Sequence, residues 1–218
     1  MTKDKNRNLK VLGEGRYPGG DYEKIKFTGK GEIYEDLRSK ETKVIGECHI
    51  NGNATMEQVH VTGDLIIDER LSSNELKIVG KLQVKKSIKA NKLDMRGFLT
   101  GAENVELEVM KLEGGFNISG LLNVGDLQVN LLVAPSKVCE IGSEKITVKS
   151  RSYMKRSYTL EAEVIEGDTI YLEHTTAKIV RGNDIEIGPN CHIEKIEYRS
   201  TFKNKEKDSK NILQVNQI

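Results

Sequence analysis

Six glycines of this 218-residue chain lie at equal intervals of 17 residues, and this spacing limits the possible fold more than any other feature. They are Gly29, Gly46, Gly63, Gly80, Gly97 and Gly114, in the segments KFTGKGEI, KVIGECHI, HVTGDLII, KIVGKLQV, DMRGFLTG and KLEGGFNI. Chance does not plausibly give five equal intervals. An internal period of this length is typical of a solenoid, in which one structural unit is stacked repeatedly.

Apolar residues follow the same period. The positions two residues before and four residues after each glycine are apolar in nearly every unit. The first set is Phe27, Val44, Val61, Ile78, Met95 and Leu112, and the second is Ile33, Ile50, Ile67, Val84, Gly101 and Ile118. Within each unit apolar and polar residues alternate, which is the period of a strand and not of a helix.

The pattern predicts an all-β fold, a single-stranded parallel β-helix (solenoid) of triangular section with about 17 residues per coil. Each coil then holds three short strands, each paired in parallel with the same strand of the next coil. Glycine suits a corner because it enters left-handed or crowded backbone conformations without steric cost. A thin core of small aliphatic side chains fits the absence of Trp, and no ligand cavity is expected.

The repeat also predicts the domain organisation. Residues 22–198 form one β-helix domain. Residues 1–21 and 199–218 are polar and lie outside the repeat, so we expect two flexible tails.

Within the domain, residues 22–149 form the regular coils. Residues 150–158 break the period and predict a protruding basic loop. Residues 159–198 resume the pattern in shorter coils, because Gly167 and Gly182 are only 15 residues apart.

Charge and cysteine content indicate the surroundings of the protein. A formal net charge of +1 does not favour nucleic acid as a partner. Cys48, Cys139 and Cys191 form no CxxC pair and are typical of small apolar residues in a reducing compartment. The start of the chain does not resemble a signal peptide, and no run of 18 apolar residues occurs. We expect a cytoplasmic protein, with the inner face of the membrane as a second location.

The sequence offers no defensible catalytic, cofactor-binding or metal-binding group, and we do not expect an enzyme. His49 and His60 fall on different sides of the coil and are interpreted as surface residues. GKGEI and GEGRYPGG do not follow a strand and open a helix, as a phosphate-binding loop does. IGPNCHI resembles one hexapeptide unit of acyltransferase helices but stands nearly alone.

The segment RSYMKRSY combines positive charge with apolar side chains, a mixture suited to anionic lipid or to a protein partner. Its candidate contact residues are Arg151, Tyr153, Met154, Lys155 and Arg156.

The two ends of the predicted solenoid carry no evident cap. A terminal coil leaves backbone N–H and C=O groups unpaired along one edge, and such edges pair with other chains. Stacking of coil on coil between molecules extends the same sheet into a filament.

The repeat at about residues 22–143 resembles that of the bactofilins, a family of polymer-forming bacterial cytoskeletal proteins. GGFNISGLLNV, EIGSEKITVKS, EGDTIYLE and VRGNDIEIGPNCHIEKIEY resemble the Gram-positive branch in particular. The resemblance implies a right-handed helix, nucleotide-independent polymerisation through the terminal coils, and scaffolding of other proteins at the inner membrane face.

We therefore expect a cytoskeletal scaffold that self-assembles end to end and recruits or positions other proteins. The partners are further copies of the chain, then other cytoplasmic or membrane proteins, with peripheral membrane contact. Candidate polymer-interface residues are Ile25 and Phe27 at one end and Ile193, Ile196 and Tyr198 at the other. The alternatives are a non-polymerising adaptor that binds lipid or a protein through the basic loop, or a β-helix transferase or glycan-binding module.

Overall fold

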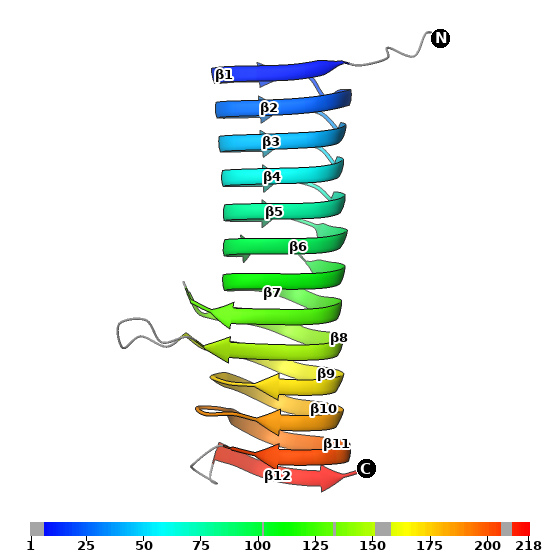
Figure 1. The fold of residues 1–218 in the computed structure, drawn as a ribbon, viewed down its shortest axis with the longest axis vertical. Helices are drawn as coiled ribbons and strands as arrows, with labels where there is room; N and C mark the ends of the chain where they lie inside the picture. Colours follow the sequence, from blue (N-terminus) through cyan, green and yellow to red (C-terminus); the bar gives the residue numbers. More distant parts are fainter. Residues whose placement is uncertain (1–6, 102, 133, 151–157, 206–210) are drawn as a thin grey trace.

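The computed structural model describes residues 7–101, 103–132, 134–150, 158–205 and 211–218. These residues form one sheet of twelve parallel strands in sequence order, and the strands stack along a single axis from β1 at one end to β12 at the other (Figure 1). The described residues contain no α-helix, so the predicted all-β solenoid is confirmed. The strands are β1 (Asn8–Tyr17), β2 (Gly20–Ile33), β3 (Leu37–Ile50), β4 (Ala54–Ile67), β5 (Leu71–Val84), β6 (Ser87–Thr100), β7 (Asn104–Leu131), β8 (Ser136–Ser150), β9 (Leu160–Leu172), β10 (Thr175–Ile187), β11 (His192–Asn204) and β12 (Ile212–Gln217).

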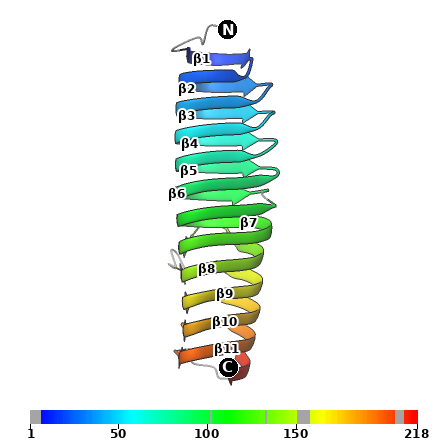
Figure 2. The ribbon, with the colours of Figure 1, turned by 90° about the vertical axis from the view of Figure 1, so that its right-hand side faces the viewer.

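From β2 to the first half of β7, residues 17 apart in sequence pair in register, as the glycine spacing predicts. Val44 pairs with Val61, and Val61 with Ile78. Their side chains are almost fully buried, while the residue directly before and the residue directly after each of them point to solvent. Each strand curves around the axis, so its inward residues stack on those of the coils before and after it (Figure 2). The core is therefore a continuous apolar column with no break between coils.

The stacked glycines form a corner that no other residue fits. Gly63 has φ of +122°, and a Cβ atom placed on it would lie 2.0 Å from the carbonyl oxygen of Gly46. Gly80 has the same conformation and would meet the oxygen of Gly63 at the same distance. The backbone of each coil thus packs directly on the coil before it at this corner, which requires glycine for both conformation and space.

The corner changes position in the second half of the molecule. β7 runs through two coils, and the spacing of paired residues rises to 19–20 residues where β7 meets β8, with a register shift between Ile118 and Leu121. From β9 to β10 the spacing falls to 15, and Gly167 pairs with Gly182. Val124 pairs with Ser143, and Ser143 pairs with Gly167, so the two glycines occupy the same register position as Val124. Val124 is a core residue. The shorter coils predicted after residue 158 are present, with a different corner.

The two tails predicted to be flexible are largely part of the solenoid. β1 lies within residues 1–21 and pairs with β2 over ten residues, at a spacing of 16 instead of 17. The end of β11 and all of β12 lie within residues 199–218. The prediction failed because both terminal coils depart from the 17-residue period. Of the predicted basic loop, Ser150 ends β8, and residues 151–157 lie outside the described residues. The hand of the helix stays a prediction.

Candidate functional site

The two outer strands of the sheet are the first candidate site. In the described part of the chain, β1 pairs only with β2 and β12 only with β11, so each has one edge without a strand partner. Backbone groups along such an edge can accept a further strand. The inward side chains at the two ends therefore determine what can stack there.

At the N-terminal end, large rings fill space that small residues leave free. Gly31 and Gly15 occupy the inward position that Cys48 occupies in the next coil. A Cβ atom on Gly31 would lie 2.4 Å from the Phe27 ring, and one on Gly15 would lie 2.5 Å from the Tyr17 hydroxyl. The two rings therefore close the end of the core, which the sequence did not suggest.

A third aromatic ring, that of Tyr22, holds the turn between β1 and β2. Tyr22 is buried, and its hydroxyl donates a hydrogen bond to the backbone oxygen of Pro18 at 3.0 Å. The guanidinium of Arg7 lies over the Tyr22 ring, 4.6 Å from its centroid. We define the partly buried Leu9 and Tyr17 of β1 as the N-terminal end surface.

At the C-terminal end the core is less well covered. β12 continues the core positions of β11, since Ile212 pairs with Ile193 and Val215 with Ile196. Val215 nevertheless remains 42% exposed, because no described strand lies beyond it. Phe202 pairs with the buried Ile185 and is itself half-buried. We define Phe202, Ile212 and Val215 as the C-terminal end surface.

The predicted interface residues lie one coil inside these ends. Ile25 and Phe27 are on β2, where they pair with Leu9 and Val11 of β1 and are almost fully buried. They are core residues and do not lie on the end of the solenoid.

The predicted residues at the other end are placed in the same way. Ile193, Ile196 and Tyr198 are on β11 and are paired with β12. Ile193 and Ile196 are buried, and Tyr198 is half-buried with its ring centroid 5.7 Å from that of Phe202. The apolar residues Val11, Ile212 and Val215 within polar segments were the available signal for the two missed terminal coils. The predicted contact residues of the basic segment, Arg151, Tyr153, Met154, Lys155 and Arg156, lie outside the described residues.

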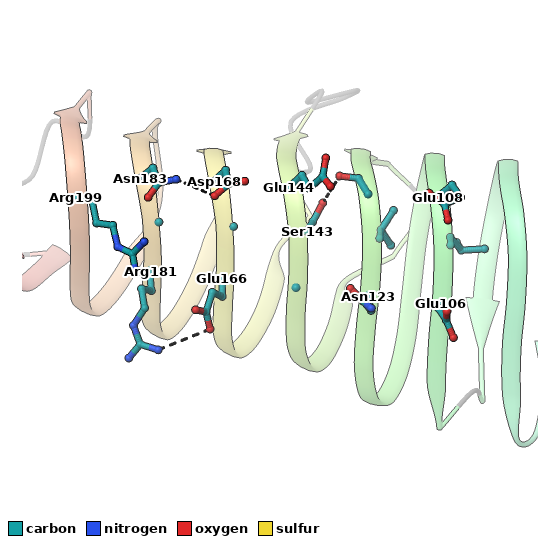
Figure 3. A pocket seen from close by; sticks show the side chains of 16 residues that line it. Glu106, Glu108, Asn123, Ser143, Glu144, Glu166, Asp168, Arg181, Asn183 and Arg199 are labelled. Carbon is teal, nitrogen blue, oxygen red and sulfur yellow. Dashed lines mark hydrogen bonds and ion pairs between the residues drawn. The ribbon is translucent and has the colours of Figure 1, made fainter. Parts of the chain in front are cut away.

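A second candidate site is a groove of about 520 Å³ that crosses the coils from β7 to β11 (Figure 3). Gly167 and Gly182 of the second glycine corner line it, together with Gly125 and Gly142. Five carboxylates, Glu106, Glu108, Glu144, Glu166 and Asp168, line it together with Arg181 and Arg199, which lie toward β11.

Arg181 and Asn183 of the groove lining contact carboxylates of neighbouring coils. Arg181 donates to Glu197 at 2.7 Å and lies 3.7 Å from Glu166, so it links three successive coils. Hydrogen bonds from Lys195 and from Arg181 hold the pKa of Glu197 below its usual range. Asn183 donates to Asp168 at 2.8 Å.

Among the described residues that line the groove, Ser143 supplies the one hydroxyl. The hydroxyl of Ser143 donates to the backbone oxygens of Gly125 and Lys145, and neither His nor Cys is among the lining residues. Within the described ranges, no group of three or more His, Cys, Asp or Glu side chains could hold a metal ion. The described residues also contain no helix long and apolar enough to cross a membrane.

Comparison with known proteins relates this chain to two proteins of Bacillus subtilis (strain 168). Uncharacterized protein YhbF is 48% identical over 81 residues, which is 36% of this chain and 34% of YhbF. Uncharacterized protein YhbE is 42% identical over 91 residues, which is 39% of this chain and 38% of YhbE. The chain thus spans less than two fifths of the length of these curated relatives. No family model and no solved structure matches this chain.

Proposed function

We propose that this protein is a structural scaffold that assembles end to end into filaments without a nucleotide. The observation that carries the proposal is that, among the described residues, β1 and β12 each have one strand edge without a partner, at opposite ends of one continuous parallel sheet. A second molecule stacked on either end adds a strand to that sheet. Such addition forms backbone hydrogen bonds and buries apolar side chains.

The side chains at the ends support this mode of assembly. Val215 occupies a core register position yet remains exposed, as expected of a coil that lacks its next neighbour. Ile218, directly after β12, is also exposed, and its N–H donates to Tyr198 at 2.9 Å. Another coil placed against this end would cover both side chains.

The resemblance to bactofilins supports the wider role. In this proposal the protein is a bactofilin of the Gram-positive type that has no catalytic activity, lies in the cytoplasm at the inner face of the membrane, and positions other proteins there. The filament presents the same surface at regular intervals, which suits the recruitment of several copies of a partner.

The test compares two arginine variants of one strand. Val215→Arg places a charge in the C-terminal end surface, whereas Leu213→Arg places the same charge two residues away on an outward side chain that is 74% exposed. Purified wild type, Val215→Arg and Leu213→Arg are examined by negative-stain electron microscopy and by sedimentation velocity. Thermal unfolding confirms that each variant remains folded.

The proposal predicts filaments or large oligomers for the wild type and for Leu213→Arg, and small species for Val215→Arg. A wild type that stays monomeric at high concentration contradicts the proposal and favours the adaptor. Equal assembly by all three proteins contradicts the assignment of the C-terminal end surface.

A further inference from the structure

One face of the solenoid carries a line of cationic side chains. Lys10, Lys26, Lys43, His60 and Lys77 are paired in register, one on each strand from β1 to β5, and all five are exposed. We name these five residues the basic row. Because adjacent strands are about 4.8 Å apart, four positive charges and one histidine lie along roughly 19 Å of the axis.

Cations elsewhere on the solenoid are commonly neutralised by a neighbouring coil. Lys24 pairs with Glu41 at 2.8 Å, Lys40 with Glu23 at 2.9 Å, and Lys89 with Glu106 at 2.9 Å. In each pair the partners are 17 residues apart, so the ion pair joins successive coils. This arrangement places opposite charges directly across from each other, which favours strand pairing.

The basic row departs from this arrangement. Lys26 is paired in register with Lys43, and like charges directly opposite each other disfavour pairing. Among the described residues, Lys77 is the one member of the row with a carboxylate within 4.0 Å, that of Glu75 at 3.0 Å. The described part of the chain thus leaves most of this charge available to an external anion.

An uncharged stripe runs beside the basic row. Leu12, Thr28, Ile45, Thr62 and Val79 are paired in register on the same five strands, two residues after the members of the row. We name them the apolar stripe. Leu12 is 71% exposed, Ile45 41% and Val79 54%, so three large apolar side chains point to solvent along one line.

The row and the stripe form one surface with a defined end. A shallow trough of about 410 Å³ lies over β3 to β6 and is lined by members of both, including Lys43, His60, Lys77 and Val79. On β6 the two positions are taken by Asp94 and Arg96, and Arg96 is paired with Glu113 at 3.0 Å. The amphipathic face therefore covers β1 to β5 and stops there.

We propose that this face binds the surface of an anionic lipid bilayer. The lysines contact the negatively charged headgroups, while Leu12, Ile45 and Val79 enter the boundary between headgroups and acyl chains. A linear polyanion would also suit the basic row, but it gives no role to the exposed apolar stripe. Neither the basic row nor the apolar stripe contains a Phe, Tyr or Trp on which nucleic-acid bases could stack. Binding requires only one molecule, so it does not depend on end-to-end assembly.

The experiment measures co-sedimentation of the purified chain with vesicles. One set of vesicles is an equal mixture of phosphatidylglycerol and phosphatidylcholine, and the other is phosphatidylcholine alone. The variant Lys26→Gln, Lys43→Gln, Lys77→Gln is expected to lose affinity by about fivefold per lysine, on the order of 100-fold in total. Its matched control, Lys40→Gln, Lys89→Gln, Lys178→Gln, removes three ion-paired lysines and is expected to bind as the wild type does.

A second variant separates lipid from other anions. Ile45→Ser with Val79→Ser is expected to weaken binding to the anionic vesicles and to leave any binding of inorganic polyphosphate unchanged, with Leu213→Ser as the exposed control. The proposal is overturned if the triple lysine variant binds like its control, or if neutral vesicles bind as tightly as anionic ones. It is also overturned if the double serine variant binds anionic vesicles as the wild type does, since the site then recognises negative charge alone.

Discussion

The ring of Tyr17 meets the ring of Phe27 edge to face, with centroids 6.0 Å apart and planes inclined by 63°. Tyr17 belongs to the first coil and Phe27 to the second, so this contact ties β1 to the rest of the core. Leu9 and Val11 of β1 also pack on the core, where they pair with Ile25 and Phe27. The aromatic pair therefore adds to the contacts that hold the N-terminal coil in place.

Replacement of Tyr17 by Ala is expected to destabilise β1 selectively. The ring contact is worth about 0.5–1.5 kcal/mol beyond its buried area, so backbone amides of β1 should exchange hydrogen faster while those of β4 and β5 do not change. Hydrogen exchange measured by mass spectrometry separates the two regions. Tyr34→Ala is the control, because Tyr34 is half exposed and its loss should change exchange little. Equal protection of β1 in wild type and Tyr17→Ala would show that the ring does not secure the first coil.

The glycine corner gives a sharper test of the fold. Gly63→Ala forces a Cβ atom to within 2.0 Å of the Gly46 oxygen at a φ of +122°, so the backbone must shift. Backbone strain of this kind costs about 1–3 kcal/mol, and the steric clash adds to it. Urea unfolding should show a loss of at least that size.

Gly142→Ala is the matched control for the corner. The nearest atom to a Cβ there is the Asn123 side-chain oxygen at 3.8 Å, and its φ is not positive. Its free energy of unfolding should change by less than about 0.5 kcal/mol. If Gly63→Ala is as stable as Gly142→Ala, the close stacking of the glycines is wrong.

The middle of the solenoid could be predicted from the sequence because there one residue position keeps one environment in every coil. Val44, Val61 and Ile78 are apolar for the same reason and pair as their spacing predicts. The corner glycines mark the same register. Periodicity and burial therefore give the fold, and the structure adds only the detail of the corner.

The ends could not be predicted because a terminal coil has lost one of the neighbours that impose the pattern. Asn8 pairs with Lys24 at a spacing of 16, and Ile193 with Ile212 at 19, so neither coil follows the 17-residue period. For this reason the repeat predicts Phe27 on an end surface, whereas the residue lies beneath β1. The basic row could not be predicted either. Charged residues at alternate positions are common on any exposed strand, and only the register of the strands shows that these five side chains lie in one line.

Acid should loosen the coils around Arg181. The pKa of Glu197 lies below the ordinary value of 4.5 because Lys195 and Arg181 donate hydrogen bonds to the carboxylate. A depressed pKa means that the folded state binds the proton more weakly than the unfolded state does. The stabilisation is therefore present above about pH 4.5 and is lost as the pH falls through the folded pKa.

The measurement is the melting temperature of wild type and Glu197→Gln from pH 7 to pH 3. The two curves should be separated at pH 7 and converge in acid, because protonation removes the same interaction that the variant lacks. Glu161→Gln, at an exposed site with no ion pair among the described residues, should run parallel to the wild type. A constant separation between wild type and Glu197→Gln at all pH values would contradict the linkage.

The three cysteines should differ in reactivity in a way that reports on the packing of the coils. Cys48 is almost fully buried in the core, and burial raises the pKa of its thiol to about 12, so little thiolate exists near pH 8. Cys191 is also buried, whereas Cys139 is half-buried. A disulfide reagent added to the native protein should therefore modify Cys139 first, and Cys48 and Cys191 only when the protein unfolds. Mass spectrometry of the modified peptides identifies the order, and Cys139→Ser should leave the native protein nearly unreactive. Rapid modification of Cys48 in native protein would mean that the coil around it opens, which is incompatible with a continuous core.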